Sequence, residues 1–506
     1  MAMTTEKVAM RDGVKLATDI YRPEGDGKYP AILIRTPYDK KAVGLAAIEG
    51  IRRKFVLIAQ DTRGRFASEG ENYPFEGDGW WSGHTDGVDT VEWIRKQPWS
   101  DGKVGTWGPS ALGIAQLGLT GAGAKVDCQY IAVAATDQYQ HAAFWGGCWR
   151  KALAEFWTAS SKYAPDAAAR WKAYPLYSSM WRDRSMETRF GQADCPAVHV
   201  GGWYDIFGQG TINSFLGFQT KGGPKARGKQ TLVMGPWTHS IFSEKAGELT
   251  YPDANKPPFG SMLDWDFFEC NLKGAQNRWN TPPAVVYYVM GAVGESGAPG
   301  NTWRTAPSWP PANSRPRDLF LTSAKGLSTG MPRTGDPVAL EYNPADPCPT
   351  MGGPQLTIPG GPMDQRKIEA RPDVITFTGD VLDRPMELTG RIKATIWLTT
   401  DATDGDLVVR LCDVYPDGRS MNFSEGYRRL KLWKTFEKET PLKAGEPIPV
   451  EVDLWSTSII LNKGHRLRIQ IAHSSFPAIE KSAYLAKSQI LTSGRFASKV
   501  TLPVMS

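Results

Sequence analysis

The sequence lacks the features that mark several large classes of protein. No apolar run approaches the roughly 20 residues that a membrane-spanning helix needs, so we expect no membrane partner. Lys and Arg form no long cluster, and a net charge of +6 on 506 residues is only mildly basic, so we expect no nucleic-acid partner. The first residues lack the apolar stretch of a signal peptide, which favours a cytoplasmic location, although removal of a leader would leave the same sequence.

Cysteine and histidine are also scarce. The six cysteines are scattered without a CxxC pair, which gives neither a zinc-binding pattern nor a disulfide framework. Six histidines leave a short list of candidates for a catalytic base. We expect neither a metal ion nor a cofactor.

The chain is too long for one hydrophobic core and should divide into domains. Over roughly the first half, buried-strand patterns such as 29–35, 197–201 and 230–235 alternate with helical patterns. This alternation predicts a mostly parallel sheet with helices on both faces. Active sites on such sheets form at the carboxyl ends of the strands.

Two segments depart from this pattern. Residues 138–192 are helix-like and dense in tryptophan, and we interpret them as a helical insertion over the sheet. After residue 282, short alternating segments such as 391–398 and 466–471 are separated by Pro, Gly and Asp turns, which predicts an all-β sandwich or jelly roll. The expected domains are an α/β core of 1–137 and 193–282, a cap of 138–192 and a β domain of 283–506.

A serine between glycines is the candidate nucleophile. Residues 108–113, Gly-Pro-Ser-Ala-Leu-Gly, follow an expected strand and precede an expected helix, and a tight strand-to-helix corner exposes a serine hydroxyl. Because Gly, Pro and Ser also form ordinary turns, the motif alone leaves Ser110 equally open as nucleophile or turn residue.

A serine hydroxyl needs a base to accept its proton and a carboxylate to orient that base. His239 follows an expected strand and a Gly-Pro turn, whereas the other histidines lie inside a strand, in the β-rich part or ahead of the required acid. Asp205 ends the strand before His239. The order Ser110, Asp205, His239, each after a strand, is that of a triad on a parallel sheet.

The oxyanion formed in acyl transfer needs two hydrogen-bond donors. The N–H of Ala111, directly after the serine, supplies one. The second usually comes from the loop after an early strand, here 34–40, where Tyr38 is either a phenol donor or a packed aromatic ring.

Several motifs in one order resemble a known family. They lie at 10–14 (Met-Arg-Asp-Gly-Val), 35–40 (Arg-Thr-Pro-Tyr-Asp-Lys), 61–70, 108–113, 202–205 (Gly-Trp-Tyr-Asp), 235–239 (Gly-Pro-Trp-Thr-His) and 413–418. Together they resemble the CocE/NonD (cocaine-esterase-like) serine hydrolases, which are related to X-Pro dipeptidyl-peptidases and α-amino-acid ester hydrolases. The resemblance implies an α/β-hydrolase core with a short helical cap and a C-terminal jelly-roll domain. It also implies Ser110, Asp205 and His239 as the triad, with the Tyr38 hydroxyl and the Ala111 N–H as the oxyanion hole.

Departures from the family pattern bear on the substrate. Ala111 stands where the family usually has tyrosine, so a side chain near the acyl pocket is lost. The α-amino-acid ester hydrolases carry acidic residues just after the triad aspartate, whereas here Phe207 lies in that stretch and no carboxylate does. Phe207 therefore suggests an apolar or aromatic acyl group. By looser matching, Trp145 and Trp157 of the cap are candidates for the same pocket or for packing of the cap on the sheet.

We expect a serine esterase or amidase that cleaves a small-molecule ester or amide through an acyl-enzyme. An acyltransferase or X-Pro-type aminopeptidase with the same triad is the alternative, and a binding protein with a vestigial hydrolase domain is a third. The short interval between Ser110 and Asp205 holds only a small cap. It suggests an open acyl pocket, or one completed by the jelly roll or by another subunit of a homo-oligomer.

Overall fold

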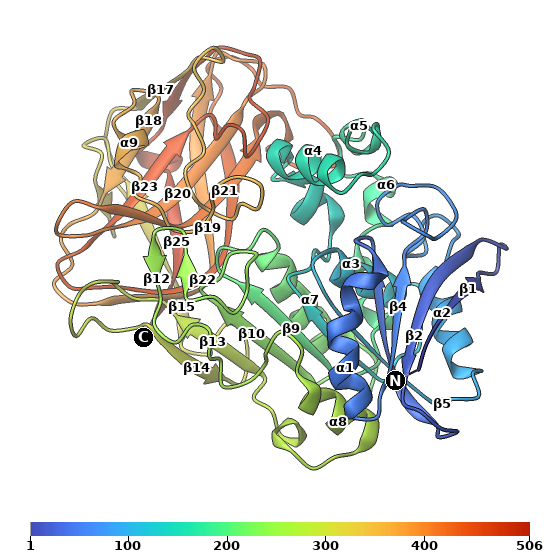
Figure 1. Ribbon diagram of the computed structural model, residues 1–506. Helices are drawn as coiled ribbons and strands as arrows, with labels where there is room; N and C mark the ends of the chain where they lie inside the picture. The colour runs from blue at the N-terminus through green and yellow to red at the C-terminus, as the bar shows by residue number, and fades with distance from the viewer. Residues whose placement is uncertain (1) are drawn as a thin grey trace.

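A ten-stranded sheet forms the N-terminal part of the molecule in the computed structural model, which describes residues 2–506 (Figure 1). Its strands, in spatial order, are β1 (Ala2–Ala9), β2 (Lys15–Arg22), β4 (Val56–Asp61), β3 (Tyr29–Thr36), β5 (Ser100–Pro109), β6 (Cys128–Ala132), β9 (Ala197–Gly202), β10 (Gln230–Gly235), β13 (Val285–Val289) and β14 (Thr302–Ala306). The run from β4 to β13 is parallel, and the outer pairs are antiparallel. The predicted mostly parallel sheet is confirmed.

Helices cover both faces of this sheet because its central strands are apolar on both sides. In β3, Ile32 and Ile34 pack on one face, and Ala31 and Leu33 pack on the other. The face that carries Ile32 and Ile34 is covered by α1 (Gly44–Arg52) and α8 (Trp265–Lys273). The opposite face is covered by α2 (Asp86–Arg95), α3 (Ala111–Gly121) and α7 (Gly208–Lys221). No helix within residues 2–506 has the length and apolar character needed to span a bilayer.

The segment between β6 and β9 lies above the sheet, between it and the C-terminal strands (Figure 1). It holds a π-helical turn (Gln138–Ala143), the short hairpin β7 (Phe144–Trp145) and β8 (Cys148–Trp149), then α4 (Lys151–Ser160), α5 (Ala167–Lys172), α6 (Ser179–Arg182) and 3₁₀ turns at Met186–Thr188 and Phe190–Gln192. The hairpin interrupts the expected helical stretch because Gly146 and Gly147 both adopt left-handed backbone, with φ of 58° and 84°.

Two antiparallel sheets form the β-rich C-terminal part. The seven-stranded sheet contains β15 (Ser314–Leu321), β16 (Leu327–Ser328), β17 (Val338–Tyr342), β19 (Met386–Thr400), β22 (Ile448–Leu461), β24 (Ala486–Ile490) and β25 (Lys499–Met505). The four-stranded sheet contains β18 (Val374–Thr378), β20 (Asp406–Val414), β21 (Ser420–Arg429) and β23 (Arg466–Ala472), and a short helix, α9 (Arg366–Glu369), precedes β18. The predicted change to β structure is confirmed.

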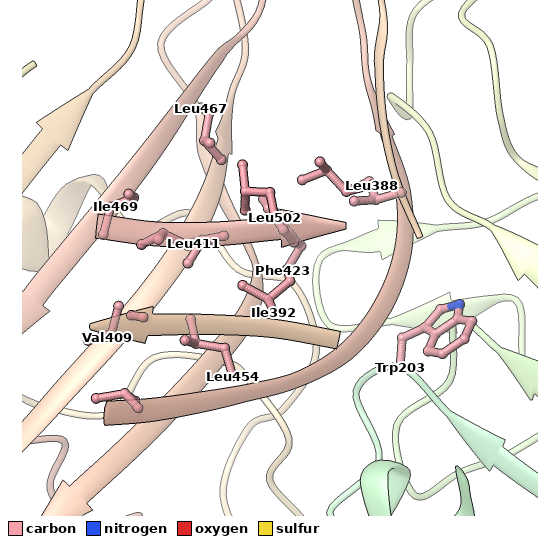
Figure 2. Close-up of a cluster of buried hydrophobic side chains, with 14 of the residues drawn as sticks. Trp203, Leu388, Ile392, Val409, Leu411, Phe423, Leu454, Leu467, Ile469 and Leu502 are labelled. Atoms are coloured by element: carbon pink, nitrogen blue, oxygen red, sulfur yellow. The ribbon is translucent and has the colours of Figure 1, made fainter. Parts of the chain in front are cut away.

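Side chains from both C-terminal sheets meet in one buried cluster (Figure 2). Ile392 and Leu454 from the larger sheet share it with Leu411 and Phe423 from the smaller one. The same cluster reaches the ten-stranded sheet through Trp203. The two parts of the molecule are therefore packed through a continuous apolar core.

The ten-stranded sheet continues past residue 282, where the expected core domain ends. β13 and β14 both follow that residue and belong to the sheet. After β13, Met290 exchanges backbone hydrogen bonds with Ser458 and Ile460 of β22, so the two sheets are also joined through their backbones.

Candidate active site

Ser110 occupies the sharp corner between β5 and α3. Its φ of 59° lies in the left-handed region, which costs a non-glycine residue energy and is typical of a strained functional turn. Close packing explains the flanking glycines, because a Cβ on Gly108 would lie 2.4 Å from the Leu112 Cβ and one on Gly113 would lie 2.8 Å from the Ala134 Cβ. The tight corner thus holds the serine with its hydroxyl within hydrogen-bond distance of His239.

Ser110, His239 and Asp205 form a continuous hydrogen-bonded chain. His239 Nε2 lies 2.9 Å from Ser110 Oγ, and His239 Nδ1 lies 2.6 Å from Asp205 Oδ1. The three residues follow β5, β9 and β10, which lie in one parallel run, so their loops meet at the same edge. With Nδ1–H donated to the carboxylate, Nε2 is free to accept the serine proton.

Asp205 is held rigidly at the end of this chain. The residue is fully buried, and its second carboxylate oxygen, Oδ2, accepts the backbone N–H of Phe207 at 3.0 Å. Both oxygens therefore have partners, which fixes the plane of the carboxylate and with it the orientation of the imidazole.

Two hydrogen-bond donors flank the serine. The Ala111 N–H lies in the first turn of α3, where backbone N–H groups have no acceptor within the helix. The Tyr38 hydroxyl accepts the indole N–H of Trp157 at 2.8 Å, and the Ser110 side chain is close enough to influence the same phenol. Burial of this hydroxyl raises the pKa of Tyr38 above its ordinary value, so the phenol keeps its proton at neutral pH.

An apolar pocket opens beside Ser110. Besides the serine, its lining consists of Phe75, Ala111, Ile114, Ala142, Leu153, Ala154, Trp157, Trp171, Ile206, Phe207 and Leu356. None of these described lining residues carries a charge. Across residues 2–506, no group of three or more His, Cys, Asp or Glu side chains is arranged to hold a metal ion.

Two of the three residues expected in the pocket lie there. Phe207 and Trp157 line it, and the Phe207 ring meets the His239 imidazole edge to face at 5.6 Å between centroids. Trp145 does not line it. It is 3% exposed and stacks on Trp455 of the C-terminal part at 4.0 Å, because the β7–β8 hairpin turns it away from the serine. Trp145 therefore packs against the C-terminal part, which is neither of the two expected places, the pocket or the sheet.

The pocket is also lined by Phe75, Trp171 and Leu356, which the sequence patterns did not indicate as pocket residues. Leu356 comes from a loop of the C-terminal part and is held near α4, since the Thr357 hydroxyl donates to the Ala152 carbonyl at 2.8 Å. Phe75 stacks on Trp157 at 5.7 Å. The local sequence around Leu356, rich in Gly and Pro, predicts only a loop, and its contact with the pocket arises from packing between distant parts of the chain.

Comparison with known proteins places this geometry in a family. Residues 12–170 and 149–241 match the model of the X-Pro dipeptidyl-peptidases (S15 family), and residues 277–485 match the model of the X-Pro dipeptidyl-peptidase C-terminal non-catalytic domain. The cocaine esterase of Rhodococcus sp. (strain MB1 Bresler) is 31% identical, over 94% of this chain and 91% of its own. A putative serine esterase of Mycobacterium tuberculosis is 26% identical, over 98% of this chain and 94% of its own.

Solved structures share the whole architecture. An α-amino acid ester hydrolase superposes with a TM-score of 0.84 at 22% identity, over 99% of this chain and 96% of its own. A CocE/NonD family hydrolase from Staphylococcus aureus superposes with a TM-score of 0.79 at 20% identity, over 100% of this chain and 93% of its own. The fold is thus an α/β-hydrolase fold followed by a C-terminal β domain.

A serine at the strand-to-helix corner of such a fold places the molecule among the serine hydrolases. More narrowly, the chain belongs to the CocE/NonD family, the cocaine-esterase-like hydrolases related to the X-Pro dipeptidyl-peptidases. The resemblance stated from the sequence motifs is confirmed, and the chain is an enzyme.

Proposed function

We propose that the chain hydrolyses small-molecule carboxylic esters with an apolar or aromatic acyl group, through a Ser110–His239–Asp205 triad and an acyl-enzyme. The observation that carries this proposal is the hydrogen-bonded chain from Asp205 to Ser110, opening into an uncharged pocket.

The chemistry follows from the positions of the atoms. Ser110 Oγ attacks the acyl carbon while His239 Nε2 takes the serine proton, and the carbonyl electron pair moves onto the oxygen. That oxyanion is stabilised by the Ala111 N–H and the Tyr38 O–H. Collapse breaks the ester bond, and the leaving alcohol takes the proton from His239. Water then attacks the acyl-enzyme, gives its proton to His239, and the released Ser110 regains that proton.

The pocket favours an uncharged acyl group. An α-ammonium group would leave water for a wall of apolar side chains, and no carboxylate among the described lining residues compensates for that loss. Phe207, Trp157 and Phe75 offer ring faces and edges to an aryl group instead. This argues against an α-aminoacyl or X-Pro substrate, although relatives of that kind share the fold.

We infer the finer architecture on the same basis. The segment 138–192 is the cap, because α4 carries Trp157 into the pocket. The C-terminal part, proposed as a jelly roll, completes the pocket through Leu356. Since β14 belongs to the ten-stranded sheet, we place the end of the core near Ala306 instead of at residue 282.

A panel of chromogenic substrates tests the proposal. We expect p-nitrophenyl benzoate and butyrate to be cleaved with higher kcat/KM than α-aminoacyl p-nitrophenyl esters and X-Pro p-nitroanilides, and Ser110→Ala to be inactive on all of them. Preference for the α-aminoacyl or X-Pro substrates would refute the acyl specificity. Amide products formed with an added amine, in place of the free acid, would identify an acyltransferase.

A further inference from the structure

The indole of Trp157 does more than line the pocket. Its Nε1 lies 2.8 Å from the Tyr38 hydroxyl oxygen. An indole N–H can only donate a hydrogen bond, so the phenol oxygen is the acceptor. The single phenol proton is therefore not used by the indole, and the Ser110 side chain is close enough to act on the same hydroxyl.

The contacts of Trp157 hold its N–H in this direction. Its ring lies near-parallel to Phe75 and to Trp171, with interplanar angles of 11° and 13°. Tyr163 packs against it at 5.1 Å. Three neighbouring rings therefore fix the rotamer of an indole that lies on α4, an element separate from the one that carries Tyr38.

Tyr38 itself needs such a partner. A phenol O–H rotates about its C–O bond to suit whichever acceptor is available, so the Tyr38 ring alone does not fix where its proton points. When the Trp157 N–H donates to a lone pair of the phenol oxygen, it restricts the directions in which the Tyr38 O–H can point. It also polarises the O–H bond, because hydrogen bonds in a chain strengthen one another.

We propose that Trp157 is a positioning residue of the oxyanion hole: by donating its indole N–H to Tyr38, it aims the phenol proton at the place where the oxyanion forms. The inference rests on the proposed roles of Ser110 and Tyr38. It gives α4 a part in the chemistry that is separate from binding the acyl group, and it predicts loss of transition-state stabilisation when the N–H alone is removed.

Trp157→Phe tests this, since phenylalanine keeps an aromatic ring and removes the donor. We expect kcat/KM for p-nitrophenyl benzoate to fall about five- to tenfold, the usual effect of one hydrogen bond. In a Tyr38→Phe background the same substitution should cause no such loss. Trp149→Phe is the matched control, because it removes an indole N–H that is donated to Glu155 and has no ring contact with Trp157, and its effect should be equal in both backgrounds.

Inhibitor binding separates this role from a structural one. Phenyl trifluoromethyl ketone forms a tetrahedral adduct with the serine, whereas the corresponding alcohol fits the pocket and forms none. We expect Trp157→Phe to lower the ratio of ketone affinity to alcohol affinity, and Trp149→Phe to preserve it. An unchanged ratio in Trp157→Phe, or an equal loss of kcat/KM with and without the Tyr38 hydroxyl, would overturn the inference.

Failure of the underlying proposal would look different. Full activity of Tyr38→Phe alone would remove Tyr38 from the oxyanion hole and the Trp157 inference with it. An active Ser110→Ala variant would refute the nucleophile itself. A third outcome would refute only the role of Trp157. Here Tyr38→Phe is slow, and Trp157→Phe lowers kcat/KM by the same factor in the Tyr38→Phe background as in the original chain.

Discussion

At the scale of one residue, Phe207 contacts both the proposed triad and the proposed acyl pocket. Its backbone N–H holds the Asp205 carboxylate, and its ring contacts the His239 imidazole and lines the acyl pocket. The backbone contact survives any substitution except proline, so a side-chain change at this position separates acyl binding from the geometry of the triad.

Phe207→Ala should therefore change acyl selectivity more than catalysis. We expect kcat/KM to fall roughly tenfold for p-nitrophenyl benzoate, because one aromatic contact is lost, and to change little for p-nitrophenyl acetate. Phe156→Ala is the control, since Phe156 is exposed on α4 and does not line the pocket. Equal losses on both esters would show that Phe207 does not contact the acyl group.

Single residues also show how far the sequence predicts the site. The hydrogen-bonded geometry brings Ser110, Asp205 and His239 together as their chain order predicts, because each loop after a parallel strand opens on the same edge of the sheet. Trp145 and Trp157 could not be distinguished, since one glycine-rich hairpin decides which ring faces the serine. Leu356 had no local signal at all, because packing between distant segments brings it to the pocket.

At the scale of elements, buried strands were predictable and irregular segments were not. The pattern at 29–35 became β3 because an unbroken apolar run suits a strand covered on both faces. The stretch that contains Phe144–Trp145 and Cys148–Trp149 lies in the segment that the sequence predicts to be helical. Gly146 and Gly147 turn it into a hairpin whose tip packs against β21.

The hairpin offers a matched pair of substitutions. A Cβ on Gly146 would lie 1.7 Å from the Tyr427 carbonyl oxygen, whereas one on Gly147 would meet a movable atom of the Leu432 side chain at 2.6 Å. Both alanine variants should lose about 1–2 kcal/mol to the left-handed backbone. Gly146→Ala should lose clearly more, because the backbone carbonyl cannot move aside.

Thermal unfolding of the two variants measures this difference. We expect a lower melting temperature for Gly146→Ala than for Gly147→Ala. Equal melting temperatures would show that the contact between the hairpin tip and β21 is looser than the structure indicates.

At the scale of the whole molecule, a buried ion cluster joins the ten-stranded sheet to the C-terminal strands. His465, fully buried, lies 2.7 Å from Asp413 of β20 through Nδ1 and 2.9 Å from Glu295 through Nε2. Glu295 belongs to the loop between β13 and β14. The Tyr415 ring covers the imidazole at 4.4 Å, and the Arg419 charge acts on both carboxylates.

This cluster makes stability depend on pH. Burial lowers the pKa of His465, but the hydrogen bonds and charges of Asp413 and Glu295 outweigh it, so the pKa is raised overall. A histidine with a raised pKa in the folded state stabilises fully below its unfolded pKa of about 6.5, and this contribution is lost as pH rises through the folded value.

His465→Gln should therefore be least stable, relative to the original chain, in mildly acidic solution. We expect the difference in melting temperature between the two to be large at about pH 6 and to shrink as the pH rises through the raised pKa of His465 in the folded state. A difference that stays constant or widens with rising pH would mean that His465 is neutral in the folded protein.

The central claim, that Ser110 is the nucleophile, is tested most directly by labelling with a fluorophosphonate. Mass spectrometry of the intact protein and of its peptides locates the adduct. We predict one adduct per chain, on the peptide that carries Ser110, and none in Ser110→Ala. An adduct on another serine, or undiminished labelling of Ser110→Ala, would contradict the account.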